Sequence, residues 1–278
     1  MSESKPVILR SSANATLRHL IKMRDNRSRR KANRVIVDGW RETSQAIHAG
    51  LELCGIYVPE SLNNGKSNDL EPVLPVVMAH ASGVNKLTWV ADPLMDRIGY
   101  GQSARGVVAE FIRPDSSLES LALPENPLIL VLDQIEKPGN IGAVFRSADA
   151  AGVNAILMSD CVDHYNPNSI RSSLGTIFQI PLASGTEKEL CNFLSSRSIN
   201  ILAARVESSK LLWKCELRGP TAIVLGSEAK GLEERWRVGN GLTIDGLRIP
   251  MAGRADSLNI AASAAIIAFE AARQRQPN

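Results

Sequence analysis

Short apolar runs alternate with amphipathic stretches along the C-terminal half of this chain. The apolar runs predict strands at residues 128–133, 155–158, 177–182, 199–204, 222–225 and 242–249. The amphipathic stretches predict helices at residues 140–151, 168–174, 187–197, 232–238 and 257–273. Because short, wholly apolar strands between helices are typical of a mainly parallel sheet covered on both faces, the pattern predicts an α/β domain over residues 128–278.

The N-terminal part mixes the two periodicities less regularly. Its pattern predicts helices at residues 15–24 and 40–49, strands at residues 34–37, 53–58, 73–78 and 106–112, and a mobile loop at residues 63–69. Residues 113–127 (RPDSSLESLALPENP) contain three prolines and a serine cluster, which is typical of a linker. We therefore predict a smaller α/β domain over residues 1–112, a linker over residues 113–127 and the larger domain after it.

The composition excludes several classes of protein. Hydrophobic residues make up 44% of the chain and charged residues 22%, as in ordinary globular proteins. No apolar run approaches the roughly 20 residues of a membrane span, and the segment MSESKPVILRSS has no apolar stretch of signal-peptide length. The four cysteines are far apart and form no CxxC pair, which disfavours a zinc site or a disulfide framework. We therefore expect a cytoplasmic protein with no membrane span and no metal.

Positive charge is concentrated near the N-terminus, although the net charge of the chain is only +3. Residues 18–34 (RHLIKMRDNRSRRKANR) hold eight basic residues and a single acid, Asp25. Such a run is either a solvated arm or a surface that contacts nucleic-acid phosphates. Because it leads directly into the strand-like segment RVIVDG, we favour the second interpretation. The residues predicted to bind the nucleic acid are Arg18, Lys22, Arg27, Arg29, Arg30 and Lys31.

Three loops that follow predicted strands hold the polar residues best suited to chemistry. The first loop reaches Asn140 and continues into a helix that carries Arg146, and the second places Glu228 directly after the strand TAIVL. The third holds Ser257 and Asn259 at the start of an alanine-rich helix. Loops at the carboxyl ends of strands in an α/β sheet can meet in one crevice. Each loop taken alone also fits a structural role, with Asn140 and Ser257 as helix caps and Glu228 as an exposed turn residue.

Together the three loops resemble the motifs of the SpoU (TrmH-like) family of RNA ribose 2′-O-methyltransferases, in the SPOUT superfamily. The matching segments are NIGAVFRSADAAG, LGSEAKGL and IPMAGRADSLNIAASAAIIAFEAARQR, and the resemblance covers residues 128–278. Residues 1–112 resemble more weakly the family's ribosomal-protein-like substrate-binding domain, through RRKANRVIVDGWRETSQAIHAG and IGYGQSARGVVAEF. The resemblance implies a trefoil knot in the C-terminal domain and a homodimer with its active site near the subunit interface.

The resemblance also implies S-adenosylmethionine as the methyl donor and a ribose 2′-hydroxyl as the acceptor. Transferred by motif, the catalytic residues are Asn140, Arg146, Glu228, Ser257 and Asn259, and the cofactor-binding residues are Ala204, Gly226, Ile249, Met251 and Leu258. The family assigns activation of the hydroxyl to Arg146, and no histidine lies in any motif. Arg146 acts either as a base in a strongly perturbed site or as a cation that stabilises the developing alkoxide. The sequence leaves both options open.

Ribosomal RNA, and 23S rRNA in particular, is the expected substrate. The separate N-terminal domain and the segment DHYNPNSIRSSLGTIF resemble rRNA-modifying relatives. With only 4% aromatic residues there are few platforms for base stacking, so phosphate and shape contacts should dominate RNA binding. The alternatives are a tRNA 2′-O-methyltransferase and a catalytically silent RNA-binding or ribosome-assembly protein on the same fold. A Rossmann-type nucleotide enzyme is disfavoured, because no GxGxxG follows the first strands.

Overall fold

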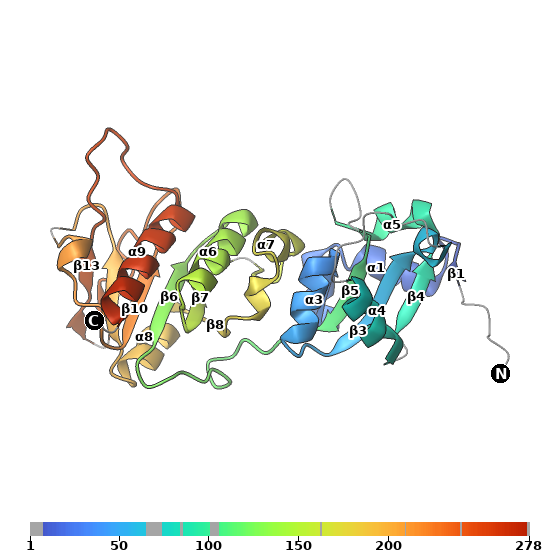
Figure 1. The fold of residues 1–278 in the computed structure, drawn as a ribbon. Helices are drawn as coiled ribbons and strands as arrows, with labels where there is room; N and C mark the ends of the chain where they lie inside the picture. Colours follow the sequence, from blue (N-terminus) through green and yellow to red (C-terminus); the bar gives the residue numbers. More distant parts are fainter. Residues whose placement is uncertain are drawn as a thin grey trace. The chain divides into compact units, whose positions relative to one another are not determined.

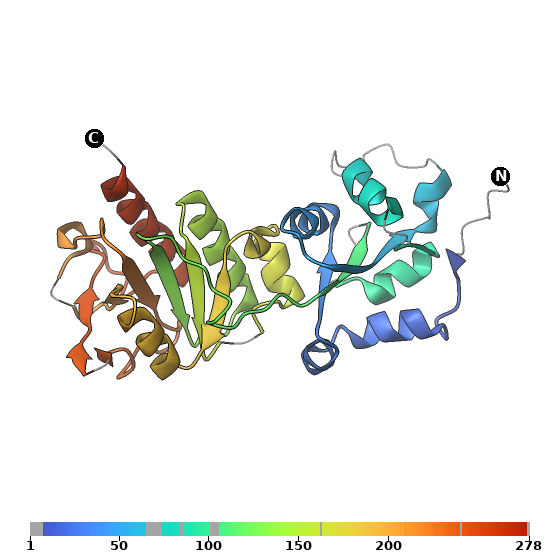
Figure 2. The same ribbon diagram turned by 90° about the horizontal axis from the view of Figure 1, so that it is seen from below.

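The computed structural model describes residues 8–64, 74–83, 86–100, 106–161, 163–208, 210–239 and 241–276. The contacts within the chain define two compact units; most of their helices and strands are labelled in Figure 1, and Figure 2 shows them from a second direction. The first unit combines Met1–Pro114 with Tyr165–Phe178, and the second combines Asp115–His164 with Gln179–Asn278. Residues 65–69 of the predicted mobile loop lie outside the described residues. In the described ranges, no helix is both long and apolar enough to cross a bilayer.

The first unit is built on a mixed five-stranded sheet in the order β1-β4-β3-β5-β2. Its strands are β1 (Ile8–Leu9), β2 (Arg34–Asp38), β3 (Leu53–Pro59), β4 (Leu87–Val90) and β5 (Val108–Ile112). Its helices are α1 (Ala15–Lys22), α2 (Asn26–Ala32), α3 (Trp40–His48), α4 (Leu74–Gly83), α5 (Asp92–Ile98) and α7 (Pro167–Ser172), with the 3-10 turns η1 (Glu60–Asn64) and η2 (Thr176–Phe178). Strand β5 is antiparallel to β2 and β3, whereas β4 is parallel to β1 and β3.

The basic run forms two short helices, where the sequence pattern predicted one helix at residues 15–24. Leu17 and Leu20 bury the inner face of α1, which leaves its basic residues on the outer face. Asp25 then interrupts the run and caps α2, because its carboxylate accepts a hydrogen bond from the Ser28 amide at 2.7 Å. The same hydrogen bond lowers the pKa of the Asp25 carboxyl. The chain leaves α2 through Asn33, whose φ of +54° ends the helix in the left-handed region.

The second unit is built on a six-stranded sheet in the order β13-β9-β10-β6-β7-β8, and all of its strand pairs are parallel. Its strands are β6 (Leu128–Asp133), β7 (Ala155–Ser159), β8 (Leu182–Gly185), β9 (Asn200–Ala204), β10 (Thr221–Leu225) and β13 (Asp245–Leu247). Its helices are α6 (Pro138–Ala150), α8 (Glu187–Ser195) and α9 (Ile260–Arg275), with the 3-10 turn η3 (Leu212–Lys214). A separate antiparallel pair joins β11 (Val238–Gly239) to β12 (Leu242–Thr243), so the strand predicted at residues 242–249 is divided between β12 and β13.

Helices cover both faces of this parallel sheet, as its apolar strands require. Helices α6 and α9 pack side by side on one face, and α8 lies on the other (Figure 2). Every residue of β6, β7 and β10 is buried, which explains why these strands read as continuous apolar runs rather than alternating ones. The predicted α/β domain with a mainly parallel sheet is confirmed.

Three elements predicted from the sequence are wrong. Residues 73–78 were expected to form a strand, but helix α4 begins at Leu74; a short apolar run fits either element, and proline is tolerated in a first helical turn. Residues 177–182 span the end of η2 and the start of β8 instead of one strand. In place of the helix predicted at residues 232–238, residues 232–236 form consecutive turns and Val238 begins β11; the buried Leu232 and Trp236 imitate the four-residue spacing of a helix.

The contacts of residues 115–127 and 165–178 bear on the domain limits. Leu118, Leu121 and Leu123 pack against the core of the second unit, and the Ser184 amide donates to the Ser116 carbonyl at 2.8 Å. Residues 165–178, which the sequence pattern placed in the C-terminal domain, pack within the first unit, where Arg171 pairs with Asp38 at 2.8 Å. The predicted limits of 1–112, 113–127 and 128–278 remain predictions.

Candidate active site

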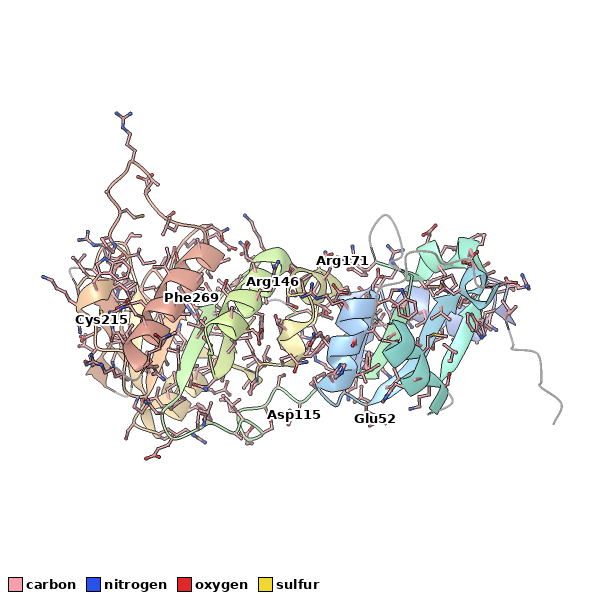
Figure 3. All side chains as sticks on the ribbon, viewed as in Figure 1. Glu52, Asp115, Arg146, Arg171, Cys215 and Phe269 are labelled. Atoms are coloured by element: carbon pink, nitrogen blue, oxygen red, sulfur yellow. The ribbon has the colours of Figure 1, made fainter. Side chains whose placement is uncertain are left out.

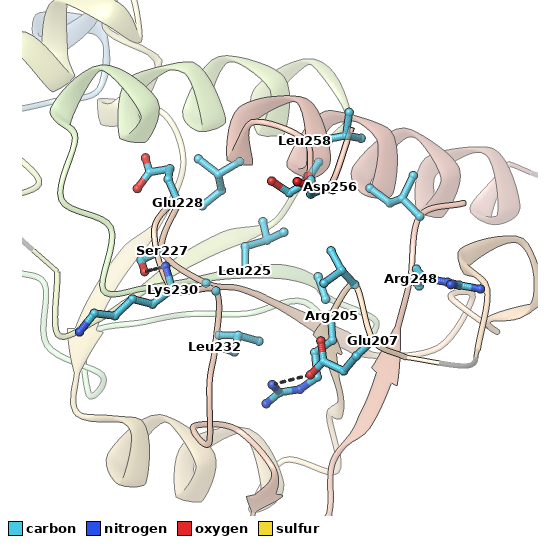
Figure 4. A pocket seen from close by; sticks show the side chains of 18 of the residues that line it. Arg205, Glu207, Leu225, Ser227, Glu228, Lys230, Leu232, Arg248, Asp256 and Leu258 are labelled. Atoms are coloured by element: carbon cyan, nitrogen blue, oxygen red, sulfur yellow. Dashed lines mark hydrogen bonds and ion pairs between the residues drawn. The ribbon is translucent and has the colours of Figure 1, made fainter. Parts of the chain in front are cut away.

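A cavity of about 450 Å³ opens at the carboxyl ends of β9, β10 and β13. Four segments and Arg237 line it: residues 204–207 at the end of β9, residues 225–233 after β10, residues 247–249 with 251 after β13, and residues 256–258 with 260 and 263 around the start of α9. Figure 4 shows side chains of these segments around the cavity. A cavity at the carboxyl ends of parallel strands is where α/β sheets generally bind ligands.

All five residues predicted to bind the cofactor line this cavity: Ala204, Gly226, Ile249, Met251 and Leu258. Each of them is a glycine or has an apolar side chain, so only their backbone groups can form hydrogen bonds with a ligand. Leu258 is 37% exposed, and Figure 4 shows it at the edge of the cavity. The sequence therefore identified the lining, whereas the binding role of these residues remains a prediction.

Close backbone packing gives the loop after β10 its shape. The Ser227 amide donates to the Gly231 carbonyl at 3.1 Å, and the Gly231 amide donates back to the Ser227 carbonyl at 2.9 Å. This bridge brings Gly231 so near to Gly226 that a Cβ atom on Gly226 would lie 2.3 Å from the Gly231 carbonyl carbon. Glycine is therefore required at position 226 by the approach of another backbone segment.

Polar side chains from all three motifs meet beside the cavity. The Asn140 side chain on α6 donates from Nδ2 to a carboxylate oxygen of Glu228. Its Oδ1 atom accepts a hydrogen bond from Asn259 Nδ2 at 3.4 Å. Glu228 is half-buried and also lines the cavity, so the chain Asn259–Asn140–Glu228 connects the start of α9, helix α6 and the loop after β10. The predicted meeting of the three loops in one place is thus present in the structure.

The helix-cap interpretations of Asn140 and Ser257 are wrong. Helix α6 begins at Pro138, so Asn140 lies inside its first turn and turns its amide toward Glu228 and Asn259. Helix α9 begins at Ile260, and its cap is Asn259, whose Oδ1 accepts from the Ala261 amide at 2.8 Å. Ser257 precedes this cap, is exposed and lines the cavity.

Arg146 lies apart from this cluster. It is exposed on α6 (Figure 3), it does not line the cavity, and among the described residues it has no hydrogen bond or ion pair. It follows Asn140 by six helical residues, which correspond to roughly 9 Å along the helix axis and about 120° around it. Within one copy of the chain, the structure therefore does not place Arg146 beside Glu228.

Five of the six residues predicted to bind nucleic acid are exposed on α1 and α2: Arg18, Lys22, Arg27, Arg30 and Lys31. The prediction for the sixth residue, Arg29, is wrong, because Arg29 is buried and only 1% exposed. Its guanidinium donates to the carbonyls of Met23 and Arg24 at 2.9 and 2.8 Å. Arg29 therefore holds the corner between the two helices and is not available to a phosphate.

Sequence reasoning missed two arginines that hold the wall of the cavity. Arg235 pairs with the buried Asp133, 102 positions earlier in the chain, through two hydrogen bonds of 2.9 Å. This pairing raises the pKa of the Arg235 guanidinium above its ordinary value. Arg205 lines the cavity and donates to carbonyls of the loop that contains Arg235. The carboxylate of Asp133 at the end of the apolar run LILVLD was the one signal in the sequence for a buried ion pair. Nothing near Asp133 in the sequence indicates that Arg235 is its partner.

Comparison with known proteins identifies the family. The model of the SpoU rRNA Methylase family matches residues 127–269, which is more than half of the chain. The chain belongs to the SpoU rRNA methylase family. The predicted family is therefore confirmed, together with the predicted enzyme class, an RNA methyltransferase that uses S-adenosylmethionine. The Rossmann-type alternative is wrong.

Two curated relatives of this SpoU methylase act on 23S rRNA according to their names. The 23S rRNA (uridine(2479)-2′-O)-methyltransferase of Streptomyces viridochromogenes is 31% identical over 197 residues, which cover 68% of each chain. The 23S rRNA (guanosine-2′-O-)-methyltransferase RlmB of Pseudomonas aeruginosa is 34% identical over 181 residues, which cover 62% of this chain and 72% of the relative.

Solved structures extend the similarity over nearly the whole SpoU methylase. A crystal structure of an RNA 2′-O ribose methyltransferase is 32% identical, with a TM-score of 0.80 and coverage of 97% of this chain and 99% of that one. The SpoU methyltransferase AviRb from Streptomyces viridochromogenes, in complex with the cofactor AdoMet, is 27% identical, with a TM-score of 0.81 and coverage of 94% and 98%. Both units of this chain are therefore included in the match.

Proposed function

We propose that this SpoU methylase transfers a methyl group from S-adenosylmethionine to a ribose 2′-hydroxyl of 23S rRNA. The observation that carries the proposal is the position of the Asn259–Asn140–Glu228 chain beside a cavity lined by all five predicted cofactor residues. This arrangement places candidate groups for the ribose next to a candidate site for the donor. The relatives that are named as 23S rRNA 2′-O-methyltransferases support the choice of substrate.

The cavity suits S-adenosylmethionine in size and chemistry. Its volume of about 450 Å³ lies within the usual range for small-molecule sites, roughly 300–1,000 Å³. Leu258 and Ile249 offer apolar surface for a planar base, and Gly226 leaves the backbone of the loop accessible. When bound, the cofactor supplies an electrophilic methyl group on a sulfonium. The residues of this chain then have to orient the ribose and remove the proton of its 2′-hydroxyl.

In this proposal Glu228 and Asn140 orient the acceptor ribose. One carboxylate oxygen of Glu228 accepts from Asn140 Nδ2, and among the described residues the other oxygen has no hydrogen-bond partner. That oxygen can accept a hydrogen bond from a ribose hydroxyl. Asn259 holds Asn140 from the other side while its own Oδ1 caps α9, so the amide is fixed before the RNA arrives. Ser257, on the cavity wall, adds a neutral hydroxyl.

A homodimer would supply the missing arginine. Arg146 is exposed on α6 and separated from Glu228 in one copy, so a second copy packed across α6 and α9 would have to bring its own Arg146 to this site. Phe269, which is 51% exposed on α9, offers apolar surface for such an interface. From that position, Arg146 would act as the base or as the cation that stabilises the developing alkoxide.

Mixing two inactive variants tests this dimer. Arg146→Ala and Glu228→Ala copies, combined after exchange of subunits, should regain about one quarter of wild-type activity, because half of the dimers then hold one intact site. Each variant alone provides the control. Activity that stays at the level of the separate variants would show that Arg146 and Glu228 must belong to the same copy.

The trefoil knot expected from the resemblance belongs to the same proposal. The chain runs from β13 through an exposed segment that ends at Asn259, and then enters α9, which packs beside α6. A knot would pass this segment through a loop formed by other parts of the second unit. It would also place the residues of motif three against those of motif two, as the lining of the cavity requires.

The exposed cations of α1 and α2 are proposed to bind the phosphates of the RNA. Arg18 and Lys22 share the outer face of α1, and Arg27, Arg30 and Lys31 are exposed on α2. Contacts of this kind give affinity that falls with salt but carry no sequence information. The choice of nucleotide must then come from the site around Glu228. A substrate in the ribosome also agrees with the expected cytoplasmic location.

The decisive experiment measures transfer of tritiated methyl groups from S-adenosylmethionine into unmodified 23S rRNA, 16S rRNA and bulk tRNA. After digestion to nucleosides, the wild-type reaction should show a labelled 2′-O-methylnucleoside from 23S rRNA. The reaction with the Glu228→Ala variant in place of wild type should show none. Label in tRNA alone would replace the proposed substrate by the tRNA alternative. RNA binding without any label, despite bound cofactor, would favour the silent assembly protein.

A further inference from the structure

Residues 226–237, which follow β10, form one wall of the cavity and contain no helix or strand. Between Gly226 and Arg237 the chain forms turns and one isolated bridge. Two residues in it that are not glycine, Glu233 and Trp236, have left-handed φ angles of +43° and +56°. Such conformations cost free energy and persist only where the surroundings determine them. Some other contacts must therefore hold this wall in the shape that the cavity needs.

Arg235 attaches the wall to the ends of two central strands. Its Nε and Nη2 atoms donate to the two carboxylate oxygens of Asp133, the last residue of β6, each at 2.9 Å. Asp133 is fully buried, so this forked pair is shielded from solvent on one side. The Nη2 atom lies 3.1 Å from Ser159 Oγ, at the end of β7, and 2.7 Å from Asp160 Oδ2. Arg235 itself does not line the cavity.

A second arginine holds the backbone of the same residue. Arg205, just after β9, donates from Nη1 to the Glu233 carbonyl at 2.8 Å and from Nη2 to the Arg235 carbonyl. Its side chain is only 7% exposed. The neighbouring Trp236 amide donates to Glu187 at 2.5 Å, at the start of α8. The wall is therefore attached at residues 233, 235 and 236 to the ends of β6, β7 and β9 and to α8, next to residues whose φ angles are left-handed.

We propose that Arg235 is a positioning residue that holds the segment from Gly226 to Arg237 in the conformation that binds S-adenosylmethionine, with Arg205 holding its backbone. This inference rests on the proposed cofactor site. Leu232 and Glu233 line the cavity next to the attachment point, so release of the Arg235 side chain changes the cavity without removing any atom that faces it. When only a fraction of the protein has the competent wall, the apparent Kd rises by the inverse of that fraction.

The test replaces Arg235 by lysine, which keeps the charge beside Asp133 but cannot form the forked pair. The Kd for S-adenosylmethionine, measured by calorimetry without RNA, should rise roughly tenfold or more as the competent fraction falls. Turnover at saturating cofactor should stay within about threefold, because bound cofactor restores the wall. Hydrogen exchange should accelerate in residues 226–237 and stay unchanged in β6 and β7. The matched control is Arg218→Lys, which alters an exposed ion pair with Glu216 in the same unit.

Three results would overturn the proposal. A folded Arg235→Lys protein that binds the cofactor within twofold of wild type would show that the forked pair between Arg235 and Asp133 does not control the site. Equal losses of cofactor affinity and turnover, with faster hydrogen exchange across the whole sheet, would show that Arg235 only stabilises the fold of the second unit. Absence of cofactor binding by the wild-type protein would refute the proposed site itself. If Arg235→Lys does not fold, the paired variant Asp133→Asn with Arg235→Gln is measured by the same criteria, because it keeps neutral hydrogen bonds without a lone buried charge.

Discussion

A single methyl group on Gly226 should close the proposed cofactor site. In Gly226→Ala the new Cβ atom would lie 2.3 Å from the Gly231 carbonyl carbon and oxygen and 2.6 Å from the Leu232 amide nitrogen. Ordinary contacts of a Cβ atom begin at 3.4 Å, so the two backbone segments must separate by about 1.1 Å, the difference between 3.4 and 2.3 Å. All three atoms belong to the backbone, and the Ser227–Gly231 bridge holds them in place, so no side chain can rotate to make room.

This displacement sets the size of the expected effect. Overpacking of this kind costs roughly 1–3 kcal/mol of folding free energy. At roughly 2–4 °C per kcal/mol, the Tm should fall by about 2–12 °C. A shift of about 1 Å in a binding wall can cost on the order of 10²-fold, so the Kd for S-adenosylmethionine should rise at least about tenfold.

Calorimetric titration and thermal unfolding of the same preparation provide the assay. The matched control is Gly219→Ala, because a Cβ atom at Gly219 meets nothing within 4 Å and its φ is not left-handed. The control should retain wild-type Kd and Tm. If Gly226→Ala binds the cofactor within twofold of wild type, the loop tolerates the displacement and close backbone packing at Gly226 does not control the site.

Replacing Arg146 by alanine should reduce turnover by at least roughly 10²-fold but leave the Kd for S-adenosylmethionine within a few-fold, since Arg146 lies outside the cavity. Near-normal turnover would remove it from the catalytic set. Exchanging the exposed Arg30 and Lys31 for glutamine should weaken rRNA binding and reduce the slope of log affinity against log salt by about two. An unchanged slope would exclude Arg30 and Lys31 from the RNA contact. Burial raises the pKa of Cys161 to about 12 and of Cys191 to about 11, from an ordinary value of 9.0. Both thiols should react slowly with Ellman's reagent at pH 8, and rapid modification of the folded protein would contradict the raised pKa values. Because the folded state holds these protons more tightly, the stability they contribute is complete below about pH 9 and is lost as the pH rises toward 11–12, which urea unfolding at pH 8 and 10.5 can measure.

The sequence by itself determined four strands of the second unit, β6, β7, β9 and β10. Strand β6 occupies the predicted residues 128–133, because a wholly apolar run between polar loops has few other stable arrangements. The capping box of α8, in which Thr186 and Glu189 exchange hydrogen bonds, is local in the same way. The lining of the cavity was also accessible from the sequence, because motif resemblance identified Gly226 and Leu258 without any coordinates.

The tertiary structure alone decided which polar residues meet and which are buried. Residues 232–238 were expected to form a helix, yet residues 232–236 form turns, because Arg205 and Arg235 bind partners far away in the chain. In the sequence Arg29 is one more cation in a basic run, but in the structure it is buried against the backbone carbonyls of the turn between α1 and α2. Periodicity reports only the neighbours within a few positions. The position of a buried charge is decided by hydrogen-bond partners that the sequence does not place beside it, since burial without them is too costly.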